Sequence, residues 1–241
     1  MYYNTKGIVL KNFNYSDSSI ISKIYTQSFG IQSYIIKGIK NKNSKIRVNQ
    51  LQPLSIIEMV VTKNEKNNLN TIKELSKNIY NSYINFNPIK TAISIFISEI
   101  IYKTIIEEEE NIALFNFLSN TIEYINSEKE LSANFHLYFL LNYSRFLGIN
   151  PLNNYSIKNT SFNIKEGEFS ANILDSSPTF ETKHSNILNN LIQTKINDLN
   201  NLKIENADKI IILKTLINHI SFHLDKNIDI LSIDVLSEYF Q

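Results

Sequence analysis

The chain has 241 residues, of which 24 are basic and 23 acidic, and its formal net charge of +1 gives no overall sign of a nucleic-acid-binding protein. Hydrophobic residues make up 43% and charged residues 20%, which excludes a disordered chain and fits one large or two small domains. The absence of cysteine excludes disulfides, thiolate zinc sites, iron–sulfur clusters and cysteine nucleophiles.

The N-terminal third is predicted to consist of short β-strands. Their residues are β-branched and apolar, and glycine- or asparagine-containing turn signals separate them. The five expected strands are Gly7–Lys11, Ser19–Thr26, Gln32–Gly38, Leu54–Val61 and Leu69–Leu75. Five short strands in close succession predict a small closed or partly closed barrel.

Beyond residue 76 the apolar residues recur at the spacing of an α-helix. Pro88 stands at a first-turn position, where proline is tolerated, and Gly148 and Pro151 are stop signals for the third helix. The four expected helices cover residues 88–101, 111–126, 132–147 and 206–224. Their apolar stripes are interpreted as core-forming faces.

The helical pattern fails between Pro151 and Thr182. Two short apolar segments flank Glu166-Gly167, which predicts a small β-hairpin, and residues 174–182 are expected to form a loop. We therefore expect an α+β protein, with a β-barrel domain over residues 1–78 and a helical domain over residues 79–241. The hairpin is expected as an insertion at about residues 152–182 of the helical domain.

The near-zero net charge conceals two oppositely charged parts. Residues 1–86 carry 12 basic and 4 acidic side chains, a net charge of +8, and residues 87–241 carry 12 basic and 19 acidic ones, a net charge of −7. This split is typical of a basic binding module on an acidic body. Five positive charges cluster around one Asn- and Ser-rich loop; they are Lys37, Lys40, Lys42, Lys45 and Arg47.

A lysine-rich loop beside a barrel can follow a phosphate backbone without reading its sequence, although it can also serve only to keep a surface soluble. We expect it to contact DNA, with a second group of phosphate contacts at Lys6, Lys11 and Lys23. Tyr15 lies in a turn next to Ser16 and Asp17, so it is the expected base-stacking residue. Arginine, the side chain suited to bidentate readout of guanine, is rare in the chain, which predicts weak sequence specificity.

Two other clusters could suggest metal binding. His219 and His223 are four residues apart on an expected helix, but no third ligand is evident, so they are interpreted as core histidines. The carboxylates of Glu107–Glu110 fall at a helix boundary and are interpreted as a solvated cap. The sequence has neither a glycine-rich phosphate loop nor a nucleophile elbow. We therefore expect no catalytic site, no metal and no cofactor.

Several segments follow one another in a recognisable order along nearly the whole chain. They are Thr5–Lys11, Tyr15–Ser19, Ile24–Thr26 with Phe29-Gly30, Ile36–Asn41, Leu51–Leu54, Leu114–Leu118, Arg145–Pro151, and His223-Leu224 followed by Ser232–Leu236. This ordered set resembles RecO, a family of bacterial recombination mediators. The resemblance implies an N-terminal OB-fold joined to a C-terminal helical domain.

The resemblance also implies a function. It implies binding of single- and double-stranded DNA, annealing of complementary strands and a place in the RecF recombination-repair pathway, in the cytoplasm at the nucleoid. It implies two protein partners, RecR and the C-terminal tail of single-strand-binding protein. That tail is acidic with an apolar end, so we expect an apolar groove rimmed by basic residues, with Arg145 and Lys103 as the nearest candidates. No contact with a membrane is expected, because neither a signal peptide nor a span of roughly 18 apolar residues is visible.

Many members of that family carry a four-cysteine zinc cluster in the helical domain. Where the cluster would fall, after Pro151, this chain has Asn153-Asn154-Tyr155 and the expected hairpin. Apolar packing by Tyr155, Phe162, Ile164 and Phe169 is expected to replace the metal. Two other functions stay open: an OB-fold protein that binds RNA or acts in translation, and an enzyme with an active site in the helical domain.

Overall fold

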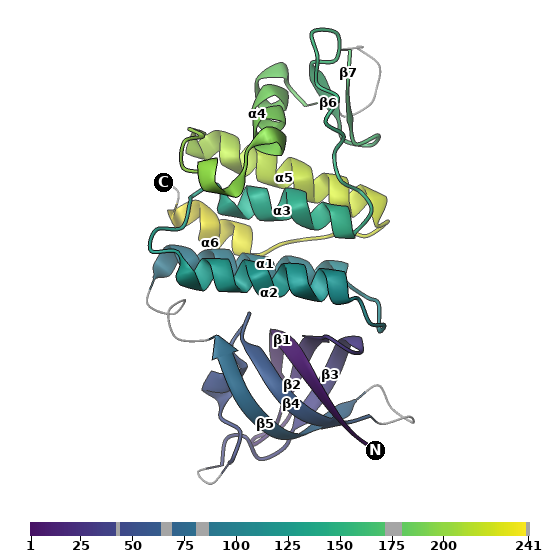
Figure 1. Ribbon diagram of the computed structural model, residues 1–241, viewed down its shortest axis with the longest axis vertical. Helices are drawn as coiled ribbons and strands as arrows, with labels where there is room; N and C mark the ends of the chain where they lie inside the picture. The colour runs from purple at the N-terminus through teal and green to yellow at the C-terminus, as the bar shows by residue number, and fades with distance from the viewer. Residues whose placement is uncertain (42–43, 64–68, 81–86, 172–179, 240–241) are drawn as a thin grey trace. The chain divides into compact units, whose positions relative to one another are not determined.

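The computed structural model describes residues 1–41, 44–63, 69–80, 87–171 and 180–239. The chain divides into two compact units, Met1–Lys129 and Glu130–Gln241, which are drawn in Figure 1. No helix within the described ranges has the length and apolar character needed to cross a bilayer.

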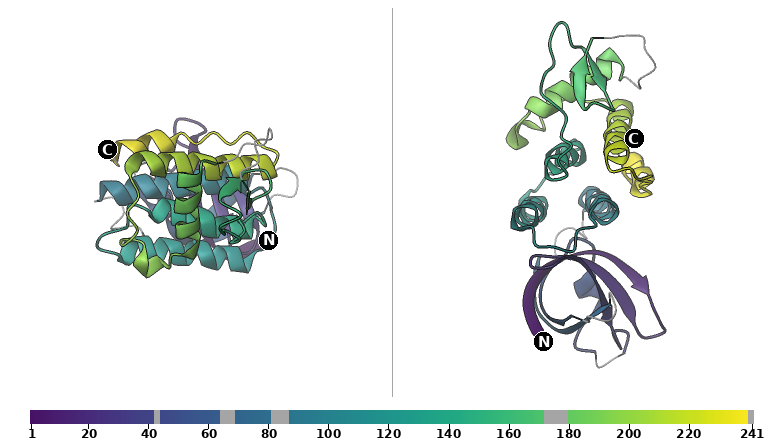
Figure 2. Two further views of the ribbon diagram at one scale, coloured as in Figure 1. Left: turned by 90° about the horizontal axis from the view of Figure 1, so that it is seen from above. Right: turned by 90° about the vertical axis from the view of Figure 1, so that its right-hand side faces the viewer.

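Five strands of the first unit form a closed barrel, in the order β1-β2-β3-β5-β4. The right-hand view of Figure 2 looks into this ring of strands. The strands are β1 (Tyr2–Asn14), β2 (Ile20–Thr26), β3 (Gly30–Ile36), β4 (Ile56–Thr62) and β5 (Asn70–Tyr80). Neighbouring strands are antiparallel except for the β3–β5 pair, which is parallel. The arrangement is an OB-fold-like barrel, as expected.

The interior of the barrel is filled by one to three side chains from each strand. Val9, Ile24, Tyr34 and Ile57 are fully buried there. Gly7 lies where β1 passes close to these side chains. A Cβ atom at this position would be 2.5 Å from the Ile24 Cγ2 atom, so only glycine fits. The core thus fixes the register of β1, which determines which of its side chains point outward.

Two helices complete the first unit: α1 (Pro88–Thr104) and α2 (Ile112–Ser127). Their N-termini are capped by Asn87 and Asn111, whose side chains accept hydrogen bonds from backbone N–H groups of the first turn. α1 packs along β1, where the Ser98 hydroxyl donates to the Leu10 carbonyl. The residues of Glu107–Glu110 are exposed between the two helices, as expected.

The second unit is built from helices and one hairpin. Its helices are α3 (Phe135–Phe146), α4 (Thr182–Gln193), α5 (Asn206–His223) and α6 (Ser232–Tyr239), with the short 3₁₀ helix η3 (Ile196–Asp198) before α5. Strands β6 (Ser161–Asn163) and β7 (Glu168–Ser170) form the hairpin. Figure 1 shows the hairpin at one end of this unit, beyond α4.

The predicted fold class is confirmed: a five-stranded barrel precedes the helices, and the hairpin lies where it was expected. Helices α4 and α6 were not predicted. The loop expected over residues 174–182 lies mostly outside the described residues. The domain boundary after residue 78 stays a prediction; α1 and α2 pack with the barrel in the first compact unit.

Candidate nucleic-acid interface

The basic loop follows β3 and is held in place at two points. Ile39 and Ile46 are buried in the core of the barrel and anchor the two ends of the loop. The backbone turns between them, with the Asn41 N–H donating to the Gly38 carbonyl at 3.0 Å. Gly38 has a φ of +68°, a conformation that favours glycine. Between these anchors, the side chains of Lys40, Asn41 and Lys45 are exposed to solvent.

The charged side chains of this loop are exposed. Lys37, Lys40, Lys45 and Arg47 all lie on the surface, and none forms an ion pair with an acidic residue in the described part of the chain. Lys42 lies outside the described residues. Four uncompensated charges on one anchored loop create a positive surface suited to a phosphate backbone.

The turn that carries Tyr15 lies beside this loop. The Lys40 N–H donates to the Ser18 carbonyl at 3.4 Å, and the Tyr15 and Ser16 N–H groups both donate to the Ser19 carbonyl. Tyr15 is 60% exposed, so its ring is available for stacking. By contrast, Tyr25 and Tyr34 are buried, and burial raises the pKa of both phenols, that of Tyr25 to about 12 with a contribution from Glu107.

The structure brings together two of the three other expected DNA-binding lysines. Lys11 and Lys23 are directly opposite each other on β1 and β2. Lys6 lies five residues before Lys11 on β1, opposite Glu58 of β4, and its Nζ atom is 3.8 Å from the Glu58 carboxylate. The charge of Lys6 is thus partly offset, whereas the other two lysines reinforce each other.

Sequence reasoning missed three contacts between basic and aromatic side chains of the first unit. Lys11 Nζ lies 5.5 Å from the centre of the Phe13 ring and 5.2 Å from that of Tyr102, a residue of α1. Lys63 Nζ lies 4.4 Å from the centre of the Phe29 ring. Lys11 and Phe13 are two residues apart on β1, a spacing that places both on one face of the strand, whereas the contacts of Lys11 with Tyr102 and of Lys63 with Phe29 have no sequence signal.

A cavity of about 400 Å³ in the second unit contains one of the two expected partner-binding residues. Arg145, in the last turn of α3, lines it together with Lys195, which sequence reasoning missed. The apolar part of the lining comes from α3, α4 and the segments that follow them: Tyr138, Leu141, Pro151, Leu191, Ile192 and Ile196. Lys103 belongs to α1 in the first unit and pairs with Glu99 at 3.4 Å. The lining also includes Asn142, Asn150, Gln193 and Thr194, so the cavity is a mixed polar and apolar groove with two cations, Arg145 and Lys195, and not the apolar groove that was expected.

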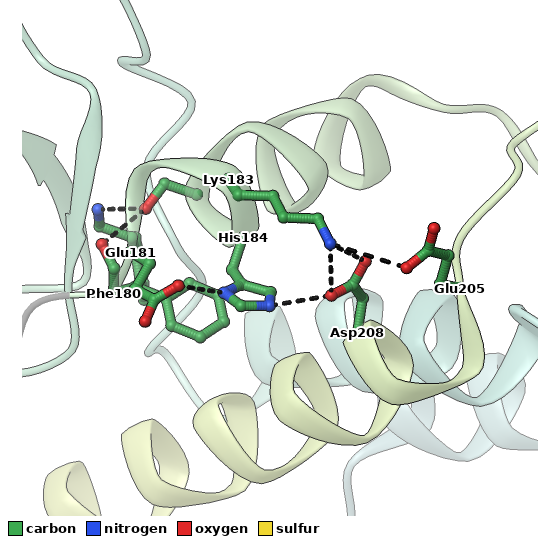
Figure 3. A network of polar contacts seen from close by, with 8 residues as sticks. Phe180, Glu181, Lys183, His184, Glu205 and Asp208 are labelled. Atoms are coloured by element: carbon green, nitrogen blue, oxygen red, sulfur yellow. Dashed lines mark hydrogen bonds and ion pairs between the residues drawn. The ribbon is translucent and has the colours of Figure 1, made fainter.

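The most extensive polar network of the second unit joins α4 to α5 (Figure 3). Lys183 Nζ lies 2.9 Å from one Asp208 carboxylate oxygen, and His184 Nε2 lies 3.0 Å from the other. Lys183, and then His184, hold the pKa of the Asp208 carboxyl below its usual range. The other ring nitrogen of His184 faces Glu181 at 3.6 Å rather than a hydroxyl group. The network therefore lacks the nucleophile–base contact of a hydrolase and instead fastens two helices together.

The hairpin is held by aromatic rings and by His219. The Phe169 ring centre lies 5.3 Å from those of Tyr155 and Phe162, as the expected packing requires. His219 is buried, and its two ring nitrogens lie 2.6 and 2.7 Å from the Ile164 and Ile149 carbonyls. Ile164 is half-buried.

The fit of a zinc cluster can be tested at this hairpin. Rings fill its interior and the chain has no cysteine, so a four-cysteine cluster does not fit. His223, expected in the core, is exposed. Over the described ranges, no group of three or more His, Asp or Glu side chains could hold a metal ion.

Comparisons with known proteins give one consistent result. The family described as "Recombination protein O N terminal" matches residues 1–79, and the one described as "Recombination protein O C terminal" matches residues 85–229. Similar proteins from Flavobacterium psychrophilum, Flavobacterium johnsoniae and Christiangramia forsetii are 35%, 31% and 29% identical. Each alignment covers 100% of both chains, and each relative is named "DNA repair protein RecO".

Proposed function

Because the chain belongs to the RecO family of DNA repair and recombination proteins, we propose that it is a recombination mediator of the RecF pathway. In this proposal it binds single- and double-stranded DNA without sequence specificity and anneals complementary strands. It also helps to load recombinase onto DNA that is coated with single-strand-binding protein. It carries out no catalytic chemistry, and it acts in the cytoplasm at the nucleoid.

The observation that carries the proposal is the anchored basic loop. Its exposed lysines have no acidic partner in the described ranges, so their charge is available to phosphates. An ammonium group contacts a phosphate as a point charge and reads no base, which supports binding without sequence preference. The adjacent turn with Tyr15 adds an exposed ring on which a base can stack.

Annealing requires that two polyanions approach each other. Lysines on one surface neutralise phosphates of both strands, and the release of condensed counterions supplies the driving force. Such binding weakens steeply as the salt concentration rises. The loop is therefore expected to determine both the affinity for DNA and its salt dependence.

The test is annealing of complementary oligonucleotides coated with the cognate single-strand-binding protein, at several salt concentrations. A Lys37/Lys40/Lys45→Ala variant removes three exposed charges of the loop. It should lower the slope of log affinity against log salt for single strands by about 2, since each phosphate contact contributes about 0.7. A Lys129/Lys158/Lys214→Ala variant removes the same charge outside the barrel and should behave like the wild type. If the wild type neither binds nor anneals the coated strands, the mediator proposal is wrong.

We also propose that the cavity of Arg145 and Lys195 receives the C-terminal tail of single-strand-binding protein. The acidic residues of the tail complement the two cations, and its apolar end fits the Leu141 and Leu191 side of the lining. A guanidinium group adds bidentate binding of a carboxylate, so Arg145 should contribute most. RecR is proposed as a further partner without an assigned surface.

A labelled peptide of that tail tests this assignment. Arg145→Ala should weaken its binding about tenfold, and Lys195→Ala somewhat less. Lys103→Ala is the comparison, since that lysine was expected from the sequence but is paired with Glu99 in the first unit. A peptide that lacks the apolar end should bind weakly to every variant. If Lys103→Ala loses more affinity for the peptide than Arg145→Ala does, the tail does not bind in the cavity.

A further inference from the structure

An aromatic and basic cluster lies on the outer surface of β1 and α1, apart from the basic loop. The rings of Phe13 and Tyr102 have centres 6.1 Å apart and are tilted by 55°. Lys11 Nζ lies within 5.5 Å of both ring centres. Phe13 is 37% exposed and Tyr102 is half-buried, so the pair presents ring surface to solvent. We call these three residues, together with Lys23, the β1–α1 platform.

The two lysines of the platform stand in an unfavourable arrangement. Lys11 and Lys23 are register partners on adjacent antiparallel strands, where side chains are close neighbours. Like charges directly opposite each other destabilise a sheet. Neither lysine has an acidic partner in the part of the chain that is described. An anion between them would remove this repulsion.

The platform is continuous with the surface already proposed for DNA. Asn14 and Tyr15 follow Phe13 along the chain and are exposed, and the turn at Ser18 is hydrogen-bonded to Lys40 of the basic loop. A strand held at the loop can therefore extend along the turn to Phe13.

We infer that the β1–α1 platform is a binding site for single-stranded DNA, where Phe13 and Tyr102 stack on unpaired bases while Lys11 and Lys23 hold the adjoining phosphate. This inference rests on the proposed function and deepens it, because it assigns one surface to single-stranded DNA alone. The basic loop contacts only phosphates and so accepts single strands and duplexes alike. Stacking on the platform requires bases that are free of a duplex.

The platform shares Lys23 of β2 with the surface that OB-fold barrels generally use, which lies on the second and third strands and the loops beside them, but its rings lie elsewhere. Here a helix outside the barrel, α1, supplies one of the two rings. Lys11 lies beyond Ile8, the last residue of β1 that is paired with β4, so Glu58 is not its neighbour. The site thus depends on the packing of α1 against β1.

Three ligands test the inference with the full-length protein: a short oligothymidylate, the same backbone with abasic residues, and a duplex of equal length. Phe13→Leu and Tyr102→Leu should each weaken binding of the oligothymidylate about tenfold, in line with the contribution of one base stack. The same variants should bind the abasic strand and the duplex as the wild type does. Phe13→Tyr and Tyr102→Phe keep a ring and should restore binding of the oligothymidylate.

Further variants test the contribution of charge, and a measurement of unfolding tests whether each variant is folded. Lys11→Gln and Lys23→Gln should weaken the binding of all three ligands, because they remove phosphate contacts. Phe222→Leu is the matched aromatic control: this exposed ring lies 5.8 Å from Lys165 in the second unit, and its loss should change nothing. Unchanged thermal unfolding of each variant shows that the barrel is intact.

The outcomes distinguish failure of the inference from failure of the proposed function. If the wild type binds all three ligands but the leucine variants lose affinity for none of them, or equally for all, the platform does not stack bases and the inference is wrong. If the wild type binds none of the three, the proposed function itself fails.

Discussion

The opposed lysines of β1 and β2 predict that a single charge reversal will stabilise the protein while it weakens DNA binding. In Lys23→Glu a carboxylate replaces the ammonium group opposite Lys11. Cross-strand pairs contribute about 0.2–1 kcal/mol each, favourable for opposite charges and unfavourable for like charges. Both side chains are partly exposed, so we expect a net gain of about 1 kcal/mol in the free energy of unfolding.

The assay is thermal unfolding in parallel with DNA binding. For a cooperative unit of this size the gain corresponds to a rise in Tm of about 3–5 °C at low salt. The rise should shrink near 1 M salt, where the Debye length falls to about 3 Å. Binding of an oligothymidylate at low salt should weaken about tenfold or more, since a phosphate contact becomes a repulsion.

A double-mutant cycle isolates the pair. Lys11→Glu alone also recreates an opposite-charge pair, but it loses the contacts of Lys11 with Phe13 and Tyr102. The double variant places two carboxylates opposite each other, so its unfolding free energy should be below the sum of the two single effects. If Lys23→Glu leaves Tm unchanged or lowers it at low salt, the lysines do not repel each other in the folded protein, and the reasoning from the strand register is refuted.

Three further predictions concern stability. Burial, with a contribution from Lys209, lowers the pKa of His136 to about 3. Below about pH 6.5 this histidine is therefore protonated in the unfolded chain, whereas in the folded chain it stays neutral. Stability should fall as the pH drops below 6.5, by up to about 1.4 kcal/mol per pH unit, and His136→Met should remove this slope in urea titrations. His219→Phe removes the ring N–H that donates to one of the Ile149 and Ile164 carbonyls and should cost about 1–3 kcal/mol, with faster hydrogen exchange at β6 and β7 as the readout. Gly7→Ala places a methyl group 2.5 Å from Ile24 and should cost about 1–3 kcal/mol in chemical denaturation, whereas no change would mean that β1 shifts freely.

Much of the fold follows from local patterns. The apolar periodicity of α1, α2, α3 and α5 is long and regular, so these helices were predicted within a few residues of their observed ends. Helix α4 is rich in polar residues, and three of its five buried positions, His184, Ser185 and Asn189, are polar, so its buried face is not an apolar stripe. Helix α6 spans only eight residues. Short helices of this kind are stabilised by tertiary packing, which a sequence window does not contain.

Of the candidate DNA-binding surface, too, the sequence predicts one part, and the other part depends on tertiary packing. The basic loop could be read from the sequence because its charges are neighbours along the chain, and its anchors are recognisable isoleucines. The sequence does not predict that the charge of Lys6 is partly offset while that of Lys11 is not, although both residues lie on β1. Pairing with β4 puts Lys6 opposite Glu58, and pairing with β2 puts Lys11 opposite Lys23. Tyr102 reaches Phe13 only because α1 packs along β1. Strand register and helix docking thus decide which charges are available.

The scarcity of arginine bears on how such a surface would anneal DNA. Only two basic residues are arginine: Arg47 lies in the basic loop and Arg145 in the cavity of the second unit, whereas the β1–α1 platform has lysine alone. A guanidinium group holds a phosphate or carboxylate in a fixed, bidentate geometry, whereas an ammonium group holds it in any orientation. Two strands must slide along each other before complementary bases meet. A surface made mostly of lysine lowers their repulsion without fixing either strand in place, and this is the property that annealing without sequence preference requires.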